Sequence, residues 1–403
     1  MRHILLALLV CASLASAQDQ IPERLLLTTG QYLGPGARAM GLGGTYTGIA
    51  DDYSAIWWNP AGLAQVKRIE MQGSLSRTAY KNETDYFGAA RDGSTATLRL
   101  NDLGMVFPVP VYQGALSFGI GYSQVLAFDR RTRVVAPAGS GAAWDDFDEL
   151  ESGRLGLWSF AGAVDVSPNL ALGLGLNYWS GADEYTLTGH YSDDGSRVYS
   201  EQNITTDVSG IGANIGGLFR IGRTGRIGLM FHSPISMSLE EDWLIDGDAG
   251  YDKYRMSYPA VFRVGGSLSP GRWLLAADLE YRDWTALSFR SDTPYRDVSK
   301  AEANQQIKDQ YQSTTRLSCG GEYLFPAYGL RGRAGLSFAP SNYRDAGGED
   351  DKTILTLGVG ILVDRSVMLD ATYHFSSYTE KVTTGLTEDI KSNAALFTLS
   401  YRL

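Results

Sequence analysis

The chain has 403 residues, is 44% hydrophobic and 11% aromatic, and carries a formal net charge of −10. An acidic balance of this kind argues against nucleic acid as a partner. The only cysteines are Cys11 and Cys319, which excludes a disulfide framework and a cysteine-based metal site.

The first residues have the pattern of a secretory signal peptide. Arg2 and His3 precede an apolar run that ends at Leu14. The small residues Ala15 to Ala17 then form a cleavage site. The run is shorter than the roughly 20 apolar residues that a membrane-spanning helix requires. We therefore expect residues 1–17 to be removed and the mature protein to be exported.

Residues 18–66 are rich in glycine and do not alternate like a strand. Within them, "GIADDYSAIWWNPAGLA" (48–64) crowds two carboxylates, two indoles and an Asn-Pro turn into one stretch. Glycine permits tight backbone with positive φ, and Asn-Pro favours a turn. The residues that we single out here are Gly41, Gly43, Gly44, Asp51, Asp52, Trp57, Trp58, Asn59 and Pro60.

From Lys67 onward, apolar and polar residues alternate in runs. In 272–284, Trp273 and Leu275 point to one face while Asp278 and Glu280 point to the other. This period of two predicts a strand with one apolar face. The fourteen runs of this kind are 67–78, 96–107, 112–127, 153–166, 170–182, 207–221, 225–239, 258–269, 272–287, 312–325, 329–340, 353–363, 366–377 and 393–403.

The connections between these runs are alternately short and long. Residues 270–271 and 364–365 are short, whereas 128–152 and 183–206 are long and acidic. Such a meander, with aromatic residues near the run ends, is typical of an outer-membrane barrel. We therefore predict an all-β fold, a 14-stranded antiparallel transmembrane β-barrel of the bacterial outer membrane formed by residues 67–403. The alternative is a secreted soluble β-sandwich with these aromatic residues in its core.

A barrel of this size encloses space. About eight strands close on a lumen filled by side chains, whereas about 16 to 18 leave an aqueous channel. A barrel of fourteen strands needs something to stop leakage. We predict that residues 18–66 form an N-terminal plug, or hatch, in the lumen. Asp51 and Asp52 would accept hydrogen bonds there, and Trp57 and Trp58 would pack against the wall.

Charged residues on the polar faces are expected to line the lumen. A lysine or arginine on a lipid face costs about 2–4 kcal/mol near the bilayer midplane. Inside, basic residues could bind a ligand headgroup, or they could form a structural ladder of ion pairs. The candidates for headgroup binding are Arg263, Arg316, Arg331 and Arg333.

The stretch "GARAMGLGGTYTGIADDYSAIWWNPAGLA" (36–64) resembles the N-terminal signature of the FadL/TodX family of outer-membrane transport proteins. Residues 258–289 and 312–341 resemble its later strands. The resemblance implies passive transport of hydrophobic small molecules, long-chain fatty acids or aromatic hydrocarbons, with a hatch rearrangement and a lateral opening in the wall. The family links this opening to a kink in the third strand.

Glycine is where a strand can bend, so glycines in run 112–127 are candidates for this kink. They are Gly114, Gly119 and Gly121. The alternative is that these glycines leave space for the plug.

The N-terminal motif is also similar to PorV-like proteins, barrels that act as cargo-binding shuttles in type IX secretion, and this alternative stays open. The chain ends with Tyr401 and Leu403 on one face, which suits the barrel-assembly machinery. Outer-membrane lipid and lipopolysaccharide are the expected surroundings. There is no Gly-x-Ser-x-Gly elbow, and we predict no enzyme, no cofactor and no metal.

Overall fold

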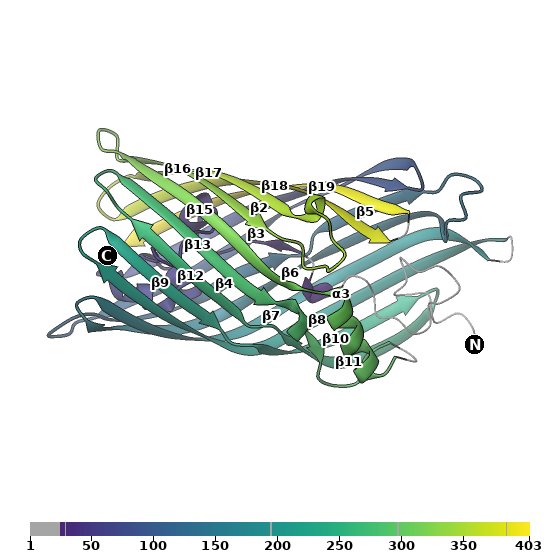
Figure 1. Cartoon of the computed structure of the whole chain (residues 1–403), viewed down its shortest axis with the longest axis horizontal. Coiled ribbons are helices and arrows are strands. Elements are labelled where there is room, and N and C mark those ends of the chain that lie inside the picture. Colours follow the sequence, from purple (N-terminus) through teal and green to yellow (C-terminus); the bar gives the residue numbers. More distant parts are fainter. Residues whose placement is uncertain (1–24, 29, 194–195, 296–297, 384) are drawn as a thin grey trace.

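The computed structural model describes residues 25–28, 30–193, 196–295, 298–383 and 385–403, so the predicted signal peptide lies outside the described residues. The strands form one antiparallel sheet that closes on itself, because β19 (Leu386–Arg402) pairs with β2 (Glu70–Tyr86) along the whole length of both. The result is an elongated barrel with tilted strands (Figure 1).

The chain crosses the wall fourteen times, as predicted. We call each crossing a stave; ten staves are single strands, and four contain two consecutive strands each. These four are β4–β5, β9–β10, β11–β12 and β13–β14. Pro234 and Pro259 lie at two of the interruptions, where a residue without an N–H group cannot continue a ladder. The remaining wall strands are β3 (Ala89–Val109), β6 (Trp144–Ser167), β7 (Leu170–Asp193), β8 (Ser196–Ile221), β15 (Ser313–Phe325), β16 (Leu330–Ala339), β17 (Lys352–Leu362) and β18 (Val367–Thr383). The paired strands are β4 (Leu116–Ala127), β5 (Arg130–Val135), β9 (Gly225–His232), β10 (Ile235–Ile245), β11 (Asp248–Tyr258), β12 (Val261–Leu268), β13 (Trp273–Asp283) and β14 (Ser288–Phe289).

Side chains alternate between an apolar outer face and a polar inner face. In β13, Trp273 is 52% exposed on the outside while Asp278 is buried inside. In β19, Phe397 and Leu399 are likewise exposed on the outside. Apolar surface costs about 25 cal/mol per Å² to keep in water, so this outer belt belongs in lipid. The closed ring makes the soluble sandwich alternative wrong.

The two ends of the barrel differ. At one end, which we call the short-turn end, neighbouring staves join through tight turns such as 222–224 and 270–272. At the other, the hairpin end, several predicted loops are continuations of strands. The expected loop 79–95 is a hairpin that turns at Phe87–Gly88, and 240–257 turns at Asp246–Gly247. The period-two pattern misses such segments because polar residues occur on both of their faces.

The helices are short. They are η1 (Leu26–Thr28), α1 (Ala37–Gly41), α2 (Ala55–Trp58), η2 (Pro60–Gln65), η3 (Trp284–Ala286), α3 (Lys300–Gln310) and η4 (Gly348–Asp350). Ser299 caps α3 by accepting from the backbone N–H of Glu302. Among the described residues, no helix has the length and apolar character needed to cross a membrane.

The N-terminal segment, residues 31–66, lies inside the ring of strands. Helix α1 contacts β16 to β19 on one side of the ring, and η2 contacts β4 and β6 to β8 on the other. Its short helices appear within the outline of the barrel (Figure 1). Almost every residue from Leu33 to Ala64 is buried, so the segment and the inner wall form one continuous core.

Candidate functional site: the barrel lumen and its N-terminal segment

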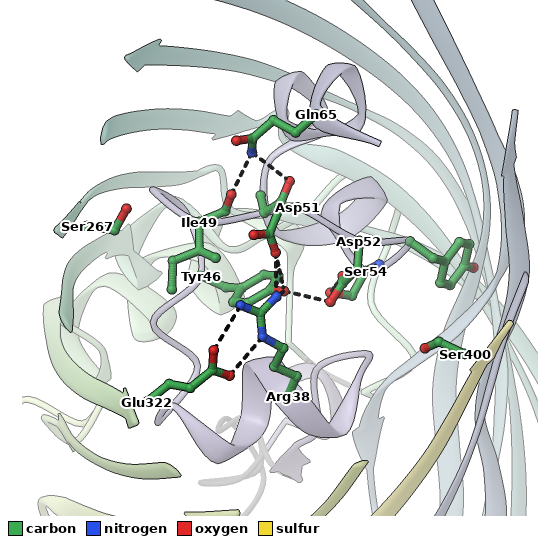
Figure 2. A network of polar contacts seen from close by, with 12 residues as sticks. Arg38, Tyr46, Ile49, Asp51, Asp52, Ser54, Gln65, Ser267, Glu322 and Ser400 are labelled. Carbon is green, nitrogen blue, oxygen red and sulfur yellow. Dashed lines mark hydrogen bonds and ion pairs between the residues drawn. The ribbon is translucent and has the colours of Figure 1, made fainter. Parts of the chain in front are cut away.

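Arg38 is the centre of a charged network that joins the N-terminal segment to the wall (Figure 2). Its Nη1 atom lies 2.5 Å from an Asp51 carboxylate oxygen and donates to the Tyr46 hydroxyl at 3.0 Å. Its Nε atom donates to Glu322 of β15 at 3.1 Å. Burial opposes ionisation of Asp51, but Arg38 and Arg226 outweigh that effect and lower the pKa of Asp51. Asp51 is therefore an ionised anchor.

The neighbouring Asp52 has a different role. The Tyr46 hydroxyl donates to Asp52 at 2.6 Å, and the hydroxyl and backbone N–H of Ser54 donate to it at 2.6 and 2.9 Å. Burial and the negative charge of Asp51 raise the pKa of Asp52. Asp52 thus stabilises the turn before α2. Of the two adjacent carboxylates, Asp51 forms the ion pair and Asp52 stabilises the turn.

Inward carboxylates of the wall hold the backbone of the segment. Asp278 accepts from the backbone N–H groups of Tyr46 and Thr47 at 3.0 and 2.9 Å. Asp102 of β3 accepts from the N–H of Gly36 at 2.9 Å. A hydrogen bond to a charged group contributes about 1.5–3 kcal/mol. Sequence reasoning missed Asp102 and Arg38, although an acidic residue at an inward position of a strand is a usable signal.

The two tryptophans pack in the lumen rather than outside it. Trp57 donates from Nε1 to the Tyr32 hydroxyl at 2.9 Å, and its ring centroid lies 4.4 Å from that of His232. Trp58 donates from Nε1 to the carbonyl of Pro35 at 3.0 Å. Arg263 lies over both indoles, at 5.6 and 5.4 Å from the ring centroids. This arrangement fixes α2 against β9 and β12.

The Asn-Pro turn connects two layers of the segment. Asn59 donates from Nδ2 to the carbonyls of Thr47 and Gly217 at 2.8 and 3.1 Å, while its side-chain oxygen caps η2. Pro60 begins η2, where a missing N–H costs nothing. Asn59 therefore forms hydrogen bonds both within the N-terminal segment and with β8.

The glycines of the motif are placed where side chains would not fit. Gly43 and Gly44 have φ of 73° and 74°, which favours glycine. A Cβ on Gly41 would lie 2.7 Å from the hydroxyl oxygen of Thr372. Glycine at these positions therefore allows α1 to lie close to the wall and the chain to turn sharply after it.

The four arginines predicted to line the lumen all lie on inner faces, but the structure does not bring them to one site. Arg263 and Arg316 both lie near Glu280, at 2.5 and 3.7 Å. Arg333 is buried between Glu322 and Asp370, at 2.6 and 2.5 Å. Arg331, near the short-turn end, forms no ion pair among the described residues, and Glu322 and Arg333 act on it only over a longer distance.

The glycines expected to kink the third stave have other positions. Gly114 lies in the turn before β4, with φ of 78°, so its expected place in the strand is wrong. A Cβ on Gly119 would touch Leu63, and one on Gly121 would lie 2.2 Å from the hydroxyl of Tyr53. Both glycines therefore give space to the N-terminal segment.

The third stave departs from regular structure further along, between Gln124 and Arg130. The register with β6 shifts at Gln124–Leu126, and β1 (Gln31–Tyr32) pairs with Leu126 and Ala127 from inside. Beyond this bend, β5 runs along the lumen, where its Thr132 donates to Glu388 of β19 at 2.8 Å. The edge of β3 from residue 89 to 101 has no strand partner on that side among the described residues.

A cavity of about 660 Å³ lies between the N-terminal segment, this bend and the segments at the hairpin end. We call it the lumen cavity. Its aromatic lining residues are Tyr32, Tyr80, Phe128, Tyr258, Trp284, Tyr343 and Tyr378. Several of its charges are paired: Arg130 with Glu149 and Glu151, and Arg282 with Glu280. Arg316 is the one predicted headgroup residue in this lining.

Comparison with known proteins identifies the architecture. A family described as outer membrane protein transport protein (OMPP1/FadL/TodX) matches residues 30–403. A Pseudomonas aeruginosa FadL homologue has 14% identity and a TM-score of 0.66, with 93% of this chain and 100% of that chain covered. The P. putida toluene transporter TodX has 16% identity and a TM-score of 0.66, with 93% and 99% covered.

A third solved structure, the Ralstonia pickettii toluene transporter TbuX, has 16% identity and a TM-score of 0.59, with 92% and 98% covered. A search of curated protein sequences finds no significant match. The resemblance to PorV-like proteins is not tested by these comparisons and stays a prediction. Because the family match spans nearly the whole described chain, this outer-membrane β-barrel belongs to the OMPP1/FadL/TodX family of transport proteins.

Proposed function

We propose that this protein carries hydrophobic small molecules passively across the outer membrane, through the lumen cavity. The observation that carries the proposal is this cavity, about 660 Å³ in volume, in which seven aromatic side chains line the wall together with polar and charged ones. Ligand pockets commonly measure about 300–1,000 Å³ and are lined mainly by apolar and aromatic groups. Solved structures of the same fold include a toluene transporter and a monoaromatic hydrocarbon channel.

In this proposal the N-terminal segment is the plug. Its position supports this role, because it contacts β4 and β8 on one side of the ring and β17 on the other. Direct passage to the short-turn end, which faces the periplasm in bacterial barrels, would require the segment to rearrange. The Arg38 network and the Asn59 bonds would have to break for that movement.

The bend of the third stave offers a way out that leaves the N-terminal segment in place, and we propose it as the main route. Leu126 to Arg130 line the lumen cavity, and the neighbouring edge of β3 has no ladder partner from 89 to 101 in the described structure. Arg99 and Thr97 of β3 donate hydrogen bonds to Asp129 in the bend, Thr97 at 2.9 Å, and so join β3 to the bend. We assign the lateral opening to this contact rather than to the glycines of β4.

Uptake of labelled toluene and labelled oleate into cells that lack other such channels tests the proposal. Ala346→Trp adds a large side chain to the cavity lining, whereas Ala371→Trp adds the same side chain to the outer face of β18 beside the exposed Leu369 and Tyr373. We expect the wild type to take up at least one compound faster than the empty vector.

The cavity variant should lose most of this uptake, and the outer-face variant should keep it. Wild-type uptake equal to the vector for both compounds contradicts transport. Equal uptake by the two tryptophan variants contradicts the cavity as the route. Because an apolar pocket discriminates a methylene by only about 1–3 kcal/mol, the two compounds are compared directly.

A further inference from the structure

A second, smaller cavity lies at the short-turn end, between the N-terminal segment and the turn that joins β17 to β18. Its volume is about 130 Å³, and it is separate from the lumen cavity. We call it the arginine pocket, because five arginines line it. They are Arg38, Arg68, Arg331, Arg365 and Arg402.

The two carboxylates of this pocket are bonded mainly to groups other than these arginines, although Asp52 also acts electrostatically on Arg38 and Arg402. Asp370 lies 2.5 Å from Arg333, which is not part of the lining, and Asp52 is held by Tyr46 and Ser54. Neither carboxylate forms an ion pair with any of the five lining arginines in the described part of the chain.

Two of the five arginines have their own partners outside the pocket. Arg38 binds Asp51 and Glu322, and Arg402 donates from Nε to Glu70 at 2.6 Å. Their charges are therefore already satisfied within the network that holds the N-terminal segment.

The other three arginines form no ion pair with a carboxylate in the described part of the chain, although Glu322 and Asp51 act on Arg331 over a longer distance. Arg68 donates to the backbone carbonyl of Arg365 at 2.7 Å, which satisfies one hydrogen but no charge. The side chains of Arg331 and Arg365 make no hydrogen bond or ion pair with any residue that the structure describes. Arg331 is also half-buried. Like charges held together in a partly buried space repel one another, and an anion removes that cost.

We propose that the arginine pocket is a binding site for one oxyanion group, a carboxylate or a phosphate. Guanidinium forks match the geometry of these groups and can bind them through paired hydrogen bonds. The pocket volume corresponds to about four water molecules at roughly 30 Å³ each, which fits one such group. The bound anion would lie beside Arg38, so occupancy adds negative charge next to the residue that anchors the N-terminal segment.

The anion can come from a phospholipid headgroup of the periplasmic leaflet or from solution. Isothermal titration of the purified protein in non-ionic detergent with inorganic phosphate and with succinate, at low ionic strength, tests the second source. Nanodiscs with and without phosphatidylglycerol, followed by native mass spectrometry of retained lipid, test the first. Low salt is needed because screening weakens the attraction between exposed arginines and an anion.

The test variant is Arg331→Gln with Arg365→Gln. The matched control is Arg223→Gln with Arg272→Gln, two exposed arginines in other turns at the same end and outside the pocket. We expect the wild type and the control to bind phosphate, succinate or phosphatidylglycerol saturably, and the test variant to bind it at least tenfold more weakly. Arg365→Gln alone, in an exposed turn, keeps the experiment decisive if the double variant does not assemble.

Retention of phosphatidylglycerol by the wild type identifies the lipid as the source, and binding of phosphate or succinate alone identifies an anion from solution. The proposal is overturned if the wild type binds none of the three, or if the test variant binds as tightly as the control. Neither result depends on uptake, so this site and the proposed transport can fail separately.

Discussion

At the scale of single residues, Arg38 ties the N-terminal segment to the wall through Glu322 and to its own turn through Asp51. Arg38→Met keeps the aliphatic part of the side chain but removes the cation that joins these carboxylates, so that Glu322 keeps only Arg333 and Asp51 keeps only the more distant Arg226. Removing one partner of a buried pair costs about 3–5 kcal/mol, and because these second arginines remain we expect the lower end of that range. Amide hydrogen exchange measures the local opening of the segment.

We expect exchange in residues 37–58 to become about 100-fold faster or more, because each 1.4 kcal/mol corresponds to a factor of about ten. Arg223→Met, in an exposed turn, is the control and should leave exchange unchanged. Equal exchange in both variants would show that Arg38 is not an anchor.

Asp51 gives the anchor a pH dependence. Its folded pKa lies below the ordinary aspartate value of about 3.9, so its stabilising contribution is complete above that value and is lost as pH falls through the folded pKa. We expect conductance bursts in planar bilayers to become more frequent as the pH falls below about 4. Asp51→Asn should show frequent bursts already at pH 7 and less change on acidification. A wild type whose conductance does not respond to this acidification would contradict the role of Asp51.

The sequence predicted which residues face the lumen but not which of them meet. A period of two assigns a face to Arg263, Arg316 and Arg333, and the structure agrees. The pair Arg38–Glu322 joins residues 284 positions apart, and its geometry depends on how the segment folds in the lumen. Strand periodicity contains no information on that.

At the scale of elements, the Asn59-Pro60 turn bonds to β8 and starts η2. Replacing both residues with alanine removes the two donated hydrogen bonds and the cap, each of which contributes about 1 kcal/mol. We expect greater sensitivity of cells to bulky antibiotics, and a larger effect when residues 36–64 are deleted. Assembly of the barrel is verified by its heat-dependent gel mobility. If the barrel assembles and antibiotic sensitivity stays at the wild-type level, this segment is not the plug.

The ends of the elements were the least predictable feature. The expected loop 183–206 belongs mostly to β7 and β8, because its polar residues alternate around a hairpin beyond the apolar belt. The kink of the third stave was expected at glycines, but the bend lies at Gln124–Arg130, where pairing with β1 competes with the wall. Tertiary contacts decide such positions, and local composition does not.

At the scale of the whole molecule, fourteen staves follow from fourteen apolar faces separated by alternating connections. This count was predictable because every stave must present an apolar face to lipid and every backbone group must find a partner in a closed ring. The two cavities were not predictable, because they depend on packing between the N-terminal segment, the bend and the turns.

The most direct test of the account is reversible cross-linking of the proposed opening. Thr97→Cys and Asp129→Cys place thiols on β3 and on the bend, whose native side chains lie 2.9 Å apart, with the exposed Cys319 changed to Ser. The measurement is the initial rate of toluene and oleate uptake by the same cells, first oxidised and then reduced. We predict that the disulfide lowers uptake to the vector level and that reduction restores it. Equal uptake in the oxidised and reduced states would contradict a route between β3 and the bend of the third stave.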